Sequence, residues 1–140
     1  MIQKIFISFL LTYVSASSIA QSSVPLNPTD TINKVFSIVE QDAEFPGGIP
    51  AWIEYIQDNL KAKVPIKKGA PKGNYNVVIM FIVSKDGSVS NITPMTNYGY
   101  GMEEEVMRVI KKGPKWKPAV LNGKTVNAYR RQPVTFQITD

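Results

Sequence analysis

Histidine and cysteine are both absent from this sequence, which removes the side chains that most catalytic and metal sites use. Without histidine, no Ser-His-Asp or Cys-His arrangement and no histidine-based zinc or iron site can form. Without cysteine, there is no thiol nucleophile, no soft metal ligand and no disulfide. Carboxylate, lysine or tyrosine chemistry remains, but no acid–base pair is identifiable. A binding module is therefore favoured over an enzyme, and no catalytic residue is predicted.

The acidic run Glu103–Glu105 is the densest group of carboxylates. Adjacent residues cannot share one helix face, so metal binding is a weaker interpretation than a helix start, where the dipole favours anions. Lys85-Asp86-Gly87 resembles a fragment of a calcium loop but lacks the further acidic ligands. Asp-Gly between two strand patterns instead indicates a hairpin turn. No metal site is predicted.

Gly99 and Gly101 form a Gly-x-Gly motif ahead of a helical pattern. The rest of the dinucleotide fingerprint is missing, and glutamates follow where a phosphate would sit. Nucleotide binding is therefore not predicted, and neither is any other cofactor.

The chain has 16 basic and 11 acidic residues, which gives a net charge of +5. Nucleic acid is not predicted as a partner, because the N-terminus of the chain has the pattern of an export signal. A solvated basic face is therefore the first interpretation. The alternative is contact with an anionic protein or membrane surface. The basic residues form two groups: Lys61, Lys63, Lys67, Lys68 and Lys72, then Lys111, Lys112, Lys115, Lys117 and Lys124, with Arg130 and Arg131 beyond.

The N-terminus has the pattern of a secretory signal, because Lys4 precedes a mostly apolar run from Ile5 to Val14. Small residues at Ser18 and Ala20 fit signal peptidase, so cleavage after Ala20 and a periplasmic location are predicted. The alternative is an uncleaved anchor, but a span needs about 20 apolar residues. Membrane contact is expected only through this segment. The predicted organisation is a signal peptide at 1–20, a flexible tether at 21–38 and one domain at 39–140.

Two pairs of elements follow from hydrophobic periodicity. A helix after Phe45-Pro46-Gly47-Gly48 is ended by Val64-Pro65, and its apolar stripe is Ile49, Trp52, Ile53, Ile56 and Leu60. A strand from Asn74 to Ser84 turns at Asp86-Gly87 into a second strand, Ser88–Thr93, whose imperfect alternation suggests a bulge.

A second helix begins near Met102 and ends at Lys112, before Gly113-Pro114. Glu104 and Arg108 are expected to pair within it. The last strand is predicted over Tyr129–Ile138. Trp52 and Trp116 are both expected in the core rather than at an interface.

These elements predict an α+β fold in which two helices pack on one face of a three-stranded antiparallel sheet. Pro133 lies inside the last strand and cannot donate to a ladder, so this strand is expected at a sheet edge or at a bulge. An edge strand is usually blunted against aggregation, and Pro133, Arg130 and Arg131 could serve that purpose alone. The other interpretation is docking of an extended peptide as an added strand.

An ordered set of segments resembles the C-terminal domain family of TonB. It covers about 100 residues, and its Phe45-Pro46-Gly47-Gly48 start resembles Bacteroidetes-type members. Two features depart from the family pattern. Val64 stands where family members often have a tyrosine before the loop proline. A short tether stands where full-length members have a membrane anchor and a long spacer. The segments are Gly73–Val89, Val109–Lys112, Pro114–Ala119, Asn122–Val126 and Pro133–Ile138.

The resemblance implies a periplasmic module of TonB-dependent transport that binds the TonB-box peptide of an outer-membrane receptor by strand addition. The alternative is a structural module that forms a homodimer through the same strand. The implied peptide-binding residues are Tyr129, Arg130, Arg131, Gln132, Val134, Thr135, Phe136 and Gln137.

Overall fold

The computed structural model describes residues 34–139. The predicted signal peptide and its cleavage site lie outside the described residues. Residues 21–33 of the predicted tether also lie outside them. The elements follow one another as β1 (Val35–Phe36), α1 (Gly48–Asn59), α2 (Val64–Lys67), β2 (Gly73–Val83), β3 (Val89–Pro94), α3 (Met102–Lys112), β4 (Ala119–Leu121) and β5 (Lys124–Ile138).

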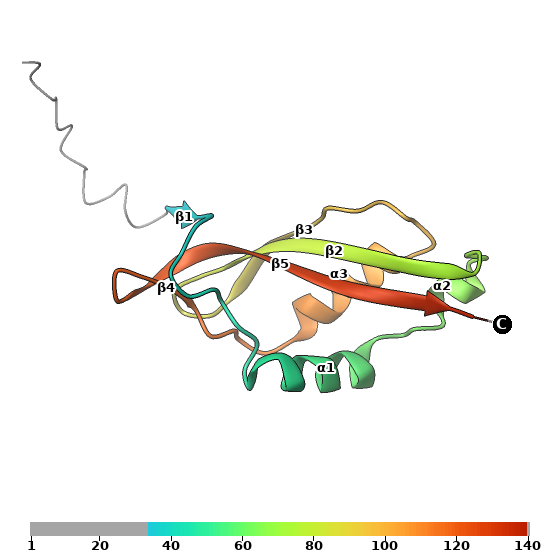
Figure 1. Cartoon of the computed structure of the whole chain (residues 1–140), viewed down its shortest axis with the longest axis horizontal. Helices are drawn as coiled ribbons and strands as arrows, with labels where there is room; N and C mark the ends of the chain where they lie inside the picture. The colour runs from blue at the N-terminus through green and yellow to red at the C-terminus, as the bar shows by residue number, and fades with distance from the viewer. Residues whose placement is uncertain (1–33, 140) are drawn as a thin grey trace, which may run out of the picture.

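Three long antiparallel strands form the centre of the sheet, in the order β5–β2–β3. The helices α1 and α3 lie on the same side of these strands (Figure 1). The α+β class and the two main helices are therefore confirmed. The strand number was wrong, because the parallel strand β1 pairs with β5 at Asn127 and Ala128, and β4 pairs with the first residues of β5.

The additional strands lie where the sequence pattern is short. β1 has two residues and falls within the predicted tether, while β4 has three. Asn122 and Gly123 join β4 to β5 with φ of 51° and 70°, which is the backbone of a tight primed turn. This hairpin lets β5 begin at Lys124 rather than at Tyr129.

Two further local predictions can be compared with the structure. The register between β2 and β3 shifts between Met80 and Ile82, so the predicted irregularity in the second strand is confirmed. The first helix was predicted to end at Val64-Pro65, but α1 already ends at Asn59, and Val64 begins the short helix α2. Pro65 occupies the first turn of α2, where a missing N–H costs nothing.

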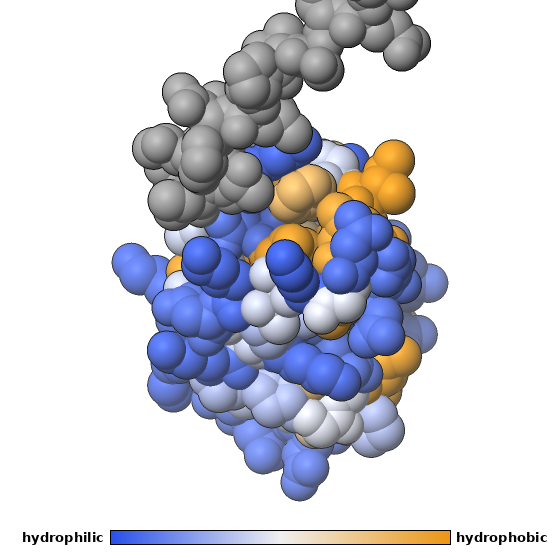
Figure 2. All heavy atoms as spheres, turned by 90° about the vertical axis from the view of Figure 1, so that its left-hand side faces the viewer, coloured by the Kyte–Doolittle hydropathy of each residue, from blue (hydrophilic) through white to orange (hydrophobic). Residues whose placement is uncertain are grey.

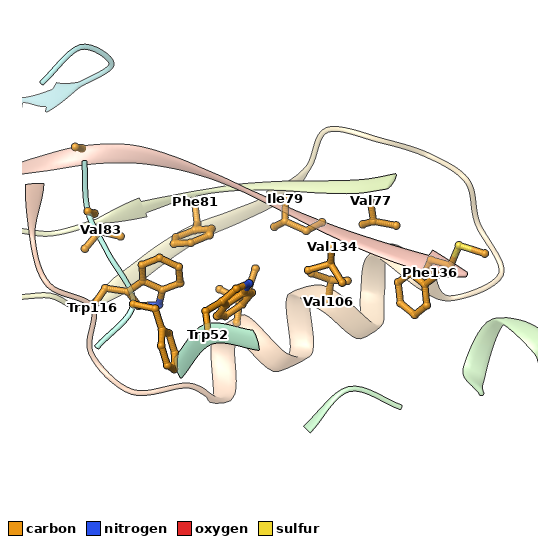
Figure 3. Close-up of a cluster of buried hydrophobic side chains, with 14 of the residues drawn as sticks. Trp52, Val77, Ile79, Phe81, Val83, Val106, Trp116, Val134 and Phe136 are labelled. Atoms are coloured by element: carbon orange, nitrogen blue, oxygen red, sulfur yellow. The ribbon is translucent and has the colours of Figure 1, made fainter. Parts of the chain in front are cut away.

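The core lies between the sheet and the two main helices (Figure 3). Val77, Ile79, Phe81 and Val83 are fully buried and alternate along β2, as one face of a strand requires. They are covered by apolar side chains of α3, including Val106 and Ile110, and of α1.

Aromatic rings close the core at one end. Trp116 meets Phe81 at 5.0 Å, and Phe45 and Trp52 at 5.6 Å each, between ring centroids. Trp52 and Trp116 are both buried, so the prediction that they belong to the core is confirmed. Such rings contribute more than their buried area because edge-to-face contacts add to it.

The acidic run at the start of α3 has two buried members. Glu103 accepts hydrogen bonds from the N–H groups of Tyr98 (2.8 Å) and Gly99 (3.1 Å), and it is 5% exposed. It thereby holds the preceding loop against the helix start, where the dipole favours a negative charge. The helix-start interpretation is confirmed for Glu103, while Glu105 has a different role, described below.

The surface is mostly polar. Figure 2 shows the end formed by β1 and the β4–β5 turn, where hydrophilic residues surround small hydrophobic patches. Ile38, beside β1, is 85% exposed. The lysines of both predicted basic groups are exposed. Between residues 34 and 139, no helix is long and apolar enough to cross a membrane.

Gly87 lies in the β2–β3 turn, close to the backbone of the buried Trp116. Substitution of this glycine tests whether the turn packs against the core. Gly87 has a φ of +86°, and a Cβ there would lie 2.3 Å from the carbonyl oxygen of Trp116. Gly123 has a φ of +70° but open space around it. We expect Gly123→Ala to cost about 1–2 kcal/mol of unfolding free energy, from the left-handed backbone alone. Gly87→Ala adds a steric term and should cost about 2–5 kcal/mol.

Urea unfolding of both variants measures the difference. Equal losses in the two variants would show that the turn is not pressed against Trp116.

Candidate functional site

The backbone of Val78 shows which edge of β5 is free. Its carbonyl accepts a hydrogen bond from Met95 N (2.8 Å), and its N–H donates to Thr96 Oγ1 (3.2 Å), so both groups point toward the β3 side of β2. Val78 is the register partner of Pro133. In an antiparallel ladder, this makes Val78 and Pro133 a non-hydrogen-bonded pair. The backbone of Pro133 therefore points away from β2.

The same alternation extends along β5. Arg131, Thr135 and Gln137 share the orientation of Pro133, so their N–H and C=O groups also point to the outer edge. Within residues 34–139, the only strand on that side is β1, whose register reaches Ala128. The expected edge position of the last strand is thus confirmed beyond Ala128. Pro133 fits there because its missing N–H faces away from the ladder.

The eight predicted site residues divide between two faces of β5. The side chains of Tyr129, Arg131, Thr135 and Gln137 are exposed, and those residues alternate with others that are mostly buried. The second group directs its side chains to the helix side and its backbone to β2. It comprises Arg130, Gln132, Val134 and Phe136.

A groove runs between α1 and the free edge of β5. It consists of two hollows of about 250 and 330 Å³, and both are lined by Trp52, Gln132 and Pro133. Ile49 lines the first hollow and Ile53 the second. The hollows therefore place apolar helix side chains beside the outward-facing backbone of β5.

The sequence did not reveal this groove. Ile49 and Ile53 were placed on the buried stripe of the first helix, but they are 71% and 50% exposed. That part of the prediction was wrong, because the sheet covers only the Trp52 side of α1. A wide apolar stripe was the available signal, and it cannot distinguish a covered face from an open one.

Arg130 lies at one end of this groove. Its terminal nitrogens contact Asp42 Oδ2 at 3.4 Å and Gln132 Oε1 at 3.5 Å, while its Nε is buried with no hydrogen-bond partner in the described structure. Both contacts are long for charge-assisted hydrogen bonds. The guanidinium therefore retains donor capacity beside the free edge.

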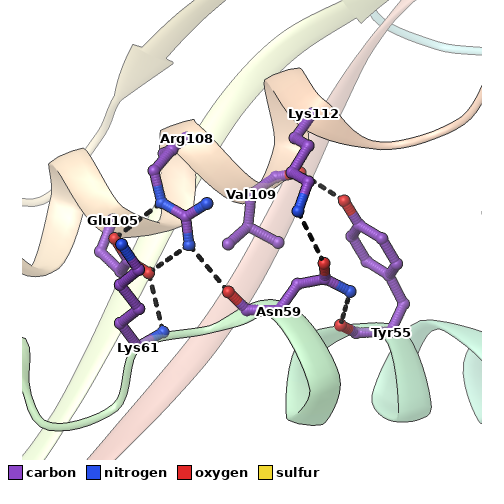
Figure 4. Close-up of polar contacts among 7 residues, drawn as sticks. All are labelled: Tyr55, Asn59, Lys61, Glu105, Arg108, Val109 and Lys112. Atoms are coloured by element: carbon purple, nitrogen blue, oxygen red, sulfur yellow. Dashed lines mark hydrogen bonds and ion pairs between the residues drawn. The ribbon is translucent and has the colours of Figure 1, made fainter.

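A polar network fixes α1 to α3 (Figure 4). Tyr55 donates to the carbonyl of Val109 (2.9 Å), and Arg108 donates to the carbonyl of Asn59 (2.7 Å). Both bonds satisfy backbone carbonyls near helix ends, which otherwise lack partners. The groove wall formed by α1 is thereby held in place.

Arg108 pairs with Glu105 at 2.6 Å, three residues away. The predicted pair with Glu104 was wrong, because the Glu105 carboxylate also accepts from the backbone N–H of Lys61 (2.7 Å). The hydrogen bond from Arg108 holds the pKa of Glu105 below its ordinary value of 4.5, against the opposing effect of burial. The Glu105 carboxylate is buried while the Arg108 side chain is 37% exposed, so breaking the pair is costly mainly because it leaves buried hydrogen-bonding groups unpaired.

The outer edge of β5 offers its main-chain groups for recognition. The outward groups of β5 are backbone donors and acceptors, flanked by an apolar groove and two arginines. In the described part of the chain, no three acidic side chains come together in a way that could hold a metal ion.

A model of the family described as Gram-negative bacterial TonB protein C-terminal matches residues 74–138. No curated protein and no solved structure matches the chain. The matched range includes nearly all of β2 and the whole free edge of β5, whereas α1 lies outside it.

Glu105→Gln tests the α1–α3 network through pH. A lowered folded-state pKa means that the carboxylate stabilises the fold above its ordinary pKa and loses this effect as pH falls through the folded value. At about pH 7 we expect the variant to be less stable by about 1–3 kcal/mol. Toward about pH 3 that difference should shrink. Urea unfolding across this pH range measures it, and a difference independent of pH would contradict the assignment.

Proposed function

We propose a function for this chain from the premise that residues 74–138 belong to the TonB C-terminal domain family. Domains of this family are periplasmic modules of TonB-dependent transport that contact outer-membrane receptors. In our proposal, the chain binds the TonB-box peptide of such a receptor as an extended strand on the outer edge of β5. It does so in the periplasm, as an exported protein cleaved after Ala20. The binding domain is residues 39–140, and residues 21–38 form its tether.

The observation that carries this proposal is the orientation of the β5 backbone. From Arg131 to Gln137, alternate residues direct donors and acceptors to an edge with no partner strand in the described structure. Peptide recognition by strand addition needs such a row of unpaired groups. No reactive side chain is needed, which agrees with the absence of histidine and cysteine.

Side chains on both faces of β5 would adjust the recognition. Arg131, Thr135 and Gln137 flank the edge on the exposed face. On the helix side, the long contacts of Arg130 leave its guanidinium able to bind an acceptor on the peptide. A charge-assisted hydrogen bond there would add both affinity and register.

Self-association is the alternative for the same edge. Two copies could pair their β5 edges about a twofold axis, since such an interface is self-complementary. Sedimentation velocity over a range of concentrations distinguishes the two. A mass that rises to that of a dimer favours self-association, and a constant monomer mass favours an edge open to a peptide.

Thr135→Pro is the sharpest test of strand addition. Thr135 directs its N–H outward, so proline removes one edge donor without removing a bond to β2. Pro133, two residues away, shows that the strand accommodates proline in this orientation. We expect binding of receptor N-terminal peptides to weaken roughly threefold to tenfold, from the loss of one hydrogen bond. Isothermal calorimetry measures the affinity.

Thr135→Val is the matched control, because it keeps the N–H and removes only the exposed hydroxyl. It should bind the peptide almost as the unchanged protein does. Two results would contradict the proposal: the same affinity for Thr135→Pro as for Thr135→Val with both variants folded, or no binding of any receptor peptide to the unchanged protein.

A further inference from the structure

We infer that the groove between α1 and β5 selects peptides whose side chains are apolar at every second position. This inference rests on the proposed strand addition and specifies which peptide the edge accepts. The occupant is an extended peptide paired with β5, and its apolar side chains point toward α1.

The geometry of an added strand supplies the first step. Successive side chains of a strand point to opposite faces of the sheet. A strand paired with the outer edge of β5 would therefore direct every second side chain to the side on which α1 lies (Figure 1). The remaining side chains would lie beside the exposed residues of β5.

The two faces next to the edge differ in chemistry. On the helix side, α1 lines the hollows mainly with apolar side chains, those of Ile49, Trp52, Ile53 and Ile56. The polar residues Glu44, Gln57, Arg130 and Gln132 lie around them. On the other face, β5 exposes polar side chains, those of Arg131, Thr135 and Gln137. An alternating peptide matches both faces at once, because its apolar side chains leave water and its polar ones remain in it.

Exposure supplies a second, independent step. Ile49 and Ile53 are 71% and 50% exposed although they adjoin the buried Trp52. Covering their apolar surface is favourable because that surface is removed from water. Since the groove adjoins the backbone groups that would pair with the peptide, one strand can occupy both.

The experiment uses three synthetic peptides of equal length with identical polar ends. One alternates valine and threonine, one has the same composition with its valines contiguous, and one contains threonine only. Each is titrated into the unchanged protein and into Ile53→Ser, with chemical shifts in two-dimensional NMR spectra as the readout. Ile66→Ser is the matched control, because Ile66 is 52% exposed but lies on α2, outside the groove.

We expect the alternating peptide to bind the unchanged protein most tightly. Ile53→Ser should weaken its binding roughly threefold to tenfold. Ile66→Ser should bind the alternating peptide as tightly as the unchanged protein does. The affinity for the threonine-only peptide should be the same in Ile53→Ser as in the unchanged protein. Equal affinity for all three peptides, or no effect of Ile53→Ser, would overturn the groove inference while leaving strand addition intact. No binding of any peptide, those of receptors included, would instead overturn the proposed function.

Discussion

The pairing of β2 with β5 is the interaction on which the rest of the structure depends. All 11 residues of β2 have a partner on β5, from Gly73 with Ile138 to Val83 with Ala128, without a shift of register. The side-chain period of a strand is two, so a slip by one residue would exchange the core face for the solvent face. The register that buries Val77 and Phe81 is therefore the register that turns the backbone of Pro133 outward. The buried core face and the outward-facing edge of β5 therefore both follow from the pairing of β2 with β5.

An edge strand that stays open must also avoid nonspecific pairing. β1 pairs with the outer edge of β5 at Asn127 and Ala128, so the open stretch begins beyond Ala128. Within it, Pro133 removes one donor, and Arg131 adds a positive charge. Natural proteins use both features against edge-to-edge aggregation. Protection and docking are compatible here, because a partner that supplies complementary side chains can offset the missing hydrogen bond.

Prediction from the sequence succeeded where the pattern was long. β2 and α3 have sustained periodicity over 11 residues each. Pro133 indicated a sheet edge or a bulge, and the edge is what the structure has beyond Ala128. It failed for β1 and β4, because two or three residues carry no period. Glu104 and Glu105 both had suitable spacing for a pair with Arg108, and the choice depended on the N–H of Lys61, 44 residues away. The exposure of Ile53 also depended on the extent of the sheet, which no local pattern contains.

The groove has one wall inside the family match and one outside it. The β5 edge lies within residues 74–138, whereas α1 precedes them. Main-chain hydrogen bonds depend little on the amino-acid sequence of the added peptide. Selectivity in strand addition therefore comes from the pockets that receive alternate side chains. Hydrogen bonds from Tyr55 and Arg108 tie α1 to the fold, so its wall is positioned before a peptide arrives. A preformed wall lowers the entropic cost of binding, which favours selection by shape over adaptation to each peptide.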